Sequence, residues 1–136
     1  MPSNSEFSRS LDEMVRNRGW YSPGHEYLAQ HDPAFLARYN EFNGSLLHAG
    51  VAEGAGELAL SLMHRQVLVA VLMAARGVET AKITRHIEKA FEFGASDQLV
   101  MEAMEVAMVV MGAPALHAGI EALIEASRGK KPQGSE

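Results

Sequence analysis

His86 is the residue of this sequence best suited to acid–base chemistry, because an imidazole gains and loses a proton near neutral pH. It falls within residues 79–93, where apolar side chains recur at three- and four-residue steps and predict an amphipathic helix. Ile83, Ile87 and Ala90 share the face that carries His86. A histidine among core-facing residues either bonds a backbone group and stays inert, or lines a pocket as a proton carrier. The spacing leaves both interpretations open.

Two more histidines, His64 and His117, lie in segments with a helical pattern. His117 indicates either an adapted pocket or a surface pair with Glu121 one turn further on. Together with His86 and a carboxylate such as Glu79, these imidazoles could bind zinc or nickel if their helices converged. No two of the histidines have the i, i+4 spacing of a helical metal motif. The sequence therefore predicts no metal site.

Composition narrows the class of protein. The chain has 136 residues, 47% of them hydrophobic, which suits one core and is too little for two ordinary domains. It contains no cysteine, so disulfides, thiolate metal sites and thiol redox chemistry are excluded. A formal net charge of -5 without basic clusters argues against nucleic acid as a partner.

Two features of the sequence bear on localisation. The longest apolar run, residues 67–75, is too short to predict a membrane span. Residues 1–10 have the character of neither a signal peptide nor a transit segment. We expect a soluble, cytoplasmic protein with no membrane partner.

The hydrophobic pattern predicts an all-α fold. Residues 20–31, which include Trp20 and His25, are expected to form either a packed connector or a lid over a cleft. The expected organisation is an N-terminal helix and connector at 1–30, a helical core at 31–128, and a disordered polar tail at 129–136. Helices are expected at 7–18, 32–48, 58–76, 79–93, 96–112 and 114–129, with a break at 50–56.

The helix expected at 96–112 indicates self-association. Met101, Met104, Met108 and Met111 follow one another at three- and four-residue steps, and a second apolar line lies on a neighbouring face. Methionine at this spacing is typical of core packing and not of a cofactor site. A helix that is apolar around most of its circumference needs neighbours on several sides, which a small monomer cannot supply. We therefore expect a homo-oligomer.

These segments together resemble the carboxymuconolactone decarboxylase family, whose sister branch is the AhpD-like alkylhydroperoxidases. The resemblance covers residues 32–123. It implies an AhpD-like helical bundle, assembled as a trimer or hexamer, in which His86 lines a cleft and handles a proton. It rests on His86, on the helix end Phe93-Gly94-Ala95-Ser96-Asp97, and on the Met-rich helix that stops at Met111-Gly112-Ala113-Pro114.

The positions of the catalytic residues in the peroxidase branch distinguish this chain from that branch. The peroxidases carry cysteines at the positions of Glu79 and Lys82, so thiol-dependent peroxide reduction is chemically unavailable to this chain. The glutamate that relays a proton in the peroxidases falls at or next to Gln66. A glutamine amide can hold a substrate carboxylate or carbonyl, but it cannot carry a proton.

The decarboxylase branch implies the first functional hypothesis, a cofactor-free decarboxylase or isomerase of a small carboxylated lactone or a related aromatic ring-cleavage acid. This reaction needs donors for carboxylates, delocalisation of the electrons left by CO2, and the return of a proton to carbon. His86 would be the proton carrier and Glu79 an orienting acid. The substrate-binding candidates are Arg65, which has a basic counterpart in the family's decarboxylases, and His64, Gln66, Lys82 and His117.

Two alternatives stand beside this hypothesis. One is a lyase, hydratase or isomerase that takes a different small acid in the same pocket. The other is a non-catalytic helical oligomer that keeps the fold and binds a small ligand or a partner. Three features depart from the family's usual pattern. They are Gln66, one additional residue between Gln66 and His86, and His117. Arg85 is a further anion-binding candidate, and an exposed ion pair with Glu88 or Glu92 is its alternative role.

Overall fold

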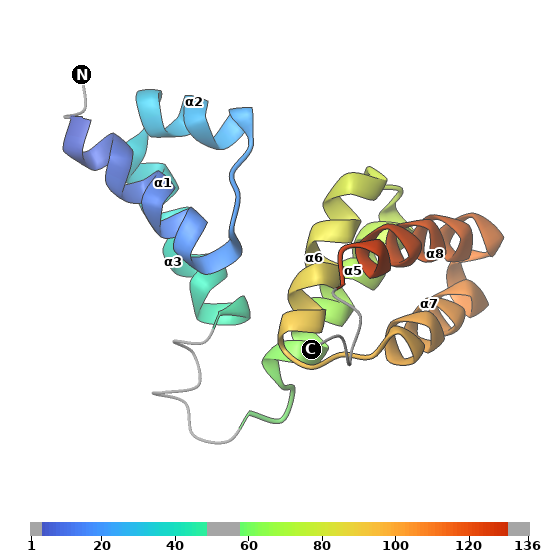
Figure 1. The fold of residues 1–136 in the computed structure, drawn as a ribbon. Helices are drawn as coiled ribbons and strands as arrows, with labels where there is room; N and C mark the ends of the chain where they lie inside the picture. Colours follow the sequence, from blue (N-terminus) through green and yellow to red (C-terminus); the bar gives the residue numbers. More distant parts are fainter. Residues whose placement is uncertain (1–3, 49–57, 131–136) are drawn as a thin grey trace. The chain divides into compact units, whose positions relative to one another are not determined.

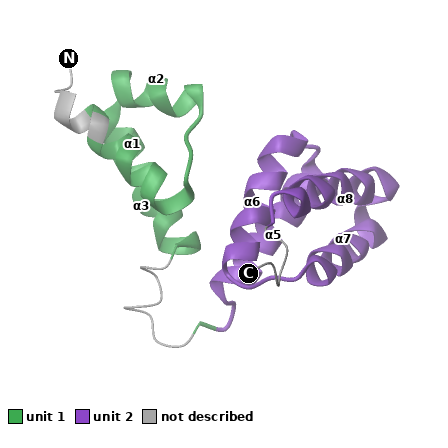
Figure 2. Ribbon diagram, in the orientation of Figure 1, with its two compact units in different colours: residues 1–58 green, residues 59–136 purple. Residues whose placement is uncertain are grey.

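The structure is a computed structural model that describes residues 4–48 and 58–130, and every element within these ranges is an α-helix (Figure 1). The expected all-α class is therefore confirmed. Contacts divide the chain into two compact units, residues 1–58 and 59–136 (Figure 2). The sequence placed a domain boundary near residue 30, whereas the contacts place it near residue 58, because the third helix packs with the first two. The predicted break at 50–56 and tail residues 131–136 lie outside the described residues.

The first unit contains α1 (Asn4–Arg18), α2 (Pro23–His31) and α3 (Pro33–Leu47). The prediction that residues 20–31 form a loop is wrong for most of that segment, because α2 occupies Pro23–His31. Only the residues before Pro23 form a connector. The local reason is a reciprocal cap at the start of α2. The backbone N–H of Ser22 donates to Nδ1 of His25 at 2.9 Å, while the N–H of His25 donates to Oγ of Ser22 at 3.4 Å.

A small apolar core holds this first unit together. Leu11 and Met14 of α1, Ala29 of α2 and Leu36 of α3 are buried against one another. The amide of the buried Asn40 donates to the backbone oxygen of Ser10 at 3.0 Å and ties α3 to α1.

The second unit contains α5 (Leu62–Arg76), α6 (Thr80–Glu92), α7 (Asp97–Met111) and α8 (Ala113–Arg128). These helices fall where the hydrophobic pattern predicted them, with ends that differ by a few residues. The start of α5 moves from the predicted residue 58 to Leu62 because the Ser61 hydroxyl accepts the N–H of His64 at 3.1 Å. Gly77 ends α5 with a positive φ of 78°, a conformation that favours glycine.

One contiguous core lies among these four helices. Helix α6 packs against α5 and α8, and α7 packs against α8. Along α7 the expected packing role of the methionines holds for Met104, which is fully buried in the core, while Met101, Met108 and Met111 are exposed in this chain. Exposed Val109 and Val110 continue the apolar surface of α7. The expected homo-oligomer stays a prediction.

No helix within residues 4–48 and 58–130 combines the length and the apolar character that a bilayer crossing requires.

Candidate functional site

His86 pairs with a glutamine on the neighbouring helix. It lies on α6 beside the buried Ile87 and is itself half-buried. Its Nδ1 atom lies 2.8 Å from Oε1 of Gln66 on α5, a residue twenty positions earlier in the sequence. The Gln66 side chain is only 1% exposed and belongs to the buried face of α5 that continues through Ala70 and Ala74. The hydrogen bond therefore joins the two helices at the margin of the core.

The chemistry of this bond defines the state of the imidazole ring. An amide oxygen only accepts hydrogen bonds, so Nδ1 of His86 must carry the proton that is shared with Gln66. In the neutral ring Nε2 then has no proton and is the basic atom. The burial of Gln66 strengthens the bond, because water does not compete for the amide oxygen. The hydrogen bond to Gln66 thus holds the His86 ring in a defined orientation.

Arg65 and His64 occupy the first turn of α5. The Arg65 side chain is half-buried, and its Nε donates to the backbone oxygen of Leu60 at 3.1 Å. His64 is exposed, and its Nδ1 lies 2.7 Å from the hydroxyl of Ser61, the residue that caps the helix. Arg65 adjoins Gln66 in the chain, so one helix carries both a cation and the partner of His86.

Glu79 and Lys82 precede His86 on α6 and are both exposed. Glu79 is the N-cap residue immediately before the first residue of α6, and its side chain makes no capping hydrogen bond. Seven residues of helix separate it from His86, a rise of about 10 Å along the axis, whereas Lys82 is about one turn away. Gln66, and not Glu79, therefore occupies the position next to the imidazole ring.

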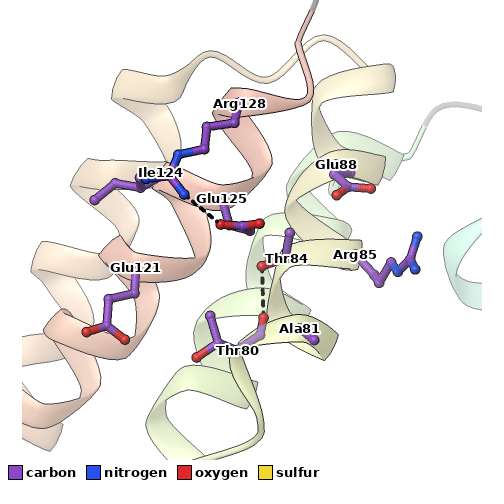
Figure 3. A pocket seen from close by; sticks show the side chains of 9 residues that line it. All are labelled: Thr80, Ala81, Thr84, Arg85, Glu88, Glu121, Ile124, Glu125 and Arg128. Atoms are coloured by element: carbon purple, nitrogen blue, oxygen red, sulfur yellow. Dashed lines mark hydrogen bonds and ion pairs between the residues drawn. The ribbon is translucent and has the colours of Figure 1, made fainter.

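Arg85 lines an open groove of about 640 Å³ between α6 and α8 (Figure 3). Thr84 ties the two helices at its floor, because its hydroxyl donates to the backbone oxygen of Thr80 at 2.8 Å and lies 3.4 Å from that of Ala122. The groove carries more carboxylates than guanidinium groups, which disfavours an acidic ligand. His86 and Gln66 are not part of its lining. Its charged residues are Arg85 and Glu88 from α6, and Glu121, Glu125 and Arg128 from α8.

His117 lies exposed on α8, one turn before Glu121. Among the residues that the structure describes, no ion pair joins these two side chains, so the predicted surface pair is not formed here. Glu92, the predicted alternative partner of Arg85, instead pairs with Lys89 at 2.8 Å. Over the same described ranges, no three histidine or carboxylate side chains gather in an arrangement that could hold a metal ion.

A separate polar cluster fixes the end of α8 to the start of α7. Asp97 pairs with Lys130 and accepts a hydrogen bond from the hydroxyl of Ser127 at 3.0 Å. The Lys130 ammonium also lies 3.5 Å from the centre of the Phe91 ring. The hydrogen bond from Lys130 is the main reason that the pKa of Asp97 lies below its ordinary value. This cluster braces the second unit and contains none of the predicted site residues.

The fold and this histidine–amide pair define a small all-α protein with one oriented imidazole between two helices. A crystal structure with the same fold is that of a protein from Burkholderia xenovorans LB400, provisionally named a carboxymuconolactone decarboxylase. The two structures have a TM-score of 0.77 over 93% of this chain and 92% of the other, with 23% sequence identity. The fold expected from the resemblance is thereby confirmed. No protein-family model and no curated protein matches the sequence.

The pairing of Gln66 with His86 was not predicted, although both residues were singled out. The sequence contained a usable signal. Gln66, Ala70 and Ala74 are spaced by four residues, so a lone amide falls in the stripe that α5 buries. Because a buried amide requires a hydrogen-bond partner, a side chain on the adjacent helix could have been sought.

Proposed function

We propose that this protein is a decarboxylase or isomerase of a small carboxylated lactone or a related ring-cleavage acid, with His86 as its proton carrier. The observation that carries the proposal is the 2.8 Å hydrogen bond between Nδ1 of His86 and Oε1 of the buried Gln66. The bond holds the imidazole in one orientation, which a general acid needs in order to deliver its proton to a fixed position. The similarity of the fold to a provisionally named carboxymuconolactone decarboxylase supports the substrate class.

In the proposed reaction the bond between the ring carbon and a carboxylate breaks, and CO2 leaves. The electron pair passes into the conjugated lactone carbonyl, and a proton is then returned to carbon at a different position. Protonated His86 donates that proton from Nε2 and is reprotonated by water. Because Nδ1 keeps its proton and its bond to Gln66 throughout, the ring does not have to reorient between the two steps.

The carboxylates of the substrate require cationic or N–H donors, and Arg65 is the first candidate among the predicted residues. It adjoins Gln66 on α5, and the bond from its Nε to Leu60 fixes its side chain beside the first turn of the helix. Lys82 lies one turn before His86 on α6 and would bind a second carboxylate. His64, Glu79 and His117 are assigned supporting roles around the substrate.

The test is a turnover assay with a panel of carboxylated muconolactones, in which CO2 release is measured for the wild type and for His86→Ala. Loss of a general acid costs about 10²- to 10⁴-fold in rate, so the variant should fall by at least a hundredfold. His31→Ala is the matched control, because His31 is an exposed histidine on α2 that belongs to no proposed site. Its rate should equal that of the wild type.

Two results would overturn the proposal. The first is turnover by the wild type that survives in His86→Ala, which would remove the proton carrier. The second is a correctly folded wild type that releases CO2 from no member of the panel, which would favour a different small acid or a non-catalytic role.

A further inference from the structure

We propose that Gln66 is a positioning residue that locks His86 as its Nδ1–H tautomer and so confines proton exchange to Nε2. The inference rests on the proposed function for its catalytic meaning, whereas the tautomer itself is a property of the protein alone. Gln66 was expected to bind substrate. Its side chain is 1% exposed and its amide oxygen is bonded to the ring, so the amide is buried away from any substrate.

The lock follows from what each atom can do. A neutral imidazole carries its proton on either nitrogen, and the partner of one nitrogen selects the tautomer. The Gln66 oxygen can accept from Nδ1–H, but it cannot donate to a bare Nδ1. If the ring adopted the Nε2–H tautomer, two acceptors would face each other in a buried position, at the cost of an unsatisfied hydrogen bond. The Nδ1–H form is therefore favoured.

The neutral charge of Gln66 matters as much as its oxygen. A carboxylate in the same buried position would also accept from Nδ1–H, but it would stabilise the imidazolium and make its Nε2 proton harder to release. An amide orients the ring without adding charge. A glutamine at this position therefore combines a fixed tautomer with a proton that can leave Nε2.

The lock can be tested by ¹⁵N NMR of the imidazole nitrogens at a pH where His86 is neutral. His86→Ala assigns the signals by their disappearance, because the chain contains 6 histidines. The wild type should show a protonated, pyrrole-type Nδ1 and an unprotonated, pyridine-type Nε2 for His86. A wild-type spectrum with the proton on Nε2 would overturn the proposal without any variant being made.

Variants of Gln66 distinguish its role in orienting the His86 ring from its role in packing. Gln66→Met keeps nearly the same side-chain volume but offers only a weakly accepting sulfur, so His86 should become a mixture of tautomers. Gln66→Glu keeps an accepting oxygen and should retain the Nδ1–H form, with an Nε2 proton that binds at least about tenfold more tightly. The matched control is Gln98→Met, because Gln98 is an exposed amide on α7 that is bonded to Glu102. Its His86 spectrum should not change. Retention of the wild-type tautomer in a folded Gln66→Met protein would show that another group holds the ring.

Failure of this inference and failure of the proposed function give different results. If the spectrum shows the Nδ1–H form but no lactone is turned over, the lock stands and the function is wrong. If lactones are turned over in a His86-dependent manner but the tautomer is Nε2–H, the function stands and the role of Gln66 is wrong. With an active substrate in hand, Gln66→Met should lower kcat by roughly tenfold to a hundredfold and leave KM nearly unchanged, since an orienting partner of a functional histidine has been lost.

Discussion

Gly119→Ala tests how tightly α7 and α8 are packed. Gly119 is buried within α8, where glycine is a poor helix former and needs a packing reason. A Cβ atom at this position would lie 2.7 Å from Cγ and 3.1 Å from Cε of Met104 on α7, and closer still to its sulfur atom. Glycine therefore leaves the space that the Met104 side chain fills.

The expected loss of stability follows from two opposing effects. Overpacking a well-filled core costs about 1–3 kcal/mol, and replacing glycine by alanine in a helix interior returns about 1 kcal/mol. Met104 is 0% exposed, so its side chain cannot move into solvent, and we take the upper part of the first range. The free energy of unfolding should therefore fall by about 2 kcal/mol.

Urea unfolding measures this change. Far-ultraviolet circular dichroism is the appropriate probe, because the single tryptophan, Trp20, belongs to the other compact unit. A loss of about 2 kcal/mol should lower the midpoint by roughly 1 M urea at an unchanged slope. Gly129→Ala is the control in the same unit. Its added Cβ would make an ordinary contact 3.5 Å from the Ala126 oxygen, and its φ of -78° suits any residue, so its midpoint should not fall.

A double variant tests whether the contact with Met104 causes the loss of stability in Gly119→Ala. In Gly119→Ala with Met104→Ala the new methyl group meets no sulfur, so the two effects should be non-additive, with the double variant about 3 kcal/mol more stable than their sum, which is the whole overpacking cost. Strict additivity, or a Gly119→Ala protein as stable as the wild type, would refute the close contact between α7 and α8.

Two further predictions concern the second unit. The pKa of Asp97 is lowered in the folded protein, chiefly by the hydrogen bond from Lys130. The stabilisation that this bond gives is therefore fully present above the unfolded pKa of about 4, and it is lost as the pH falls through the lower folded pKa. Asp97→Asn should therefore be less stable than the wild type near neutral pH and should match it in strong acid, and urea midpoints that differ equally at both pH values would contradict the assignment. Gly77→Ala should lower the free energy of unfolding by about 1 kcal/mol. No neighbouring atom lies within 4 Å of an added Cβ, so the loss comes from the strain of an alanine backbone at a φ of 78°. Gly77→Asn should lose less in the same urea assay, and an alanine variant with a wild-type midpoint would exclude the left-handed cap.

The helices of the second unit could be predicted because their signals are local. The Ser96 hydroxyl accepts the N–H of Leu99 at 3.0 Å, and Gly77 and Gly112 have positive φ values, as residues at helix ends often do. Helix α2 was missed because its apolar pattern is weak and its start depends on a cap between Ser22 and His25. A histidine is not the usual residue in that type of cap.

By itself, the sequence determined the order of the helices in the second unit, the lack of a sulfur nucleophile, and the presence of an imidazole beside a core-facing stripe. These properties depend on side-chain periods, caps and composition, all of which act over a few residues. The pairing of His86 with Gln66 was decided only by the tertiary structure, since it joins residues twenty positions apart on two helices. A hydrogen bond of this kind depends on how α5 and α6 pack and on how deeply each side chain is buried. Local propensity carries no information on either.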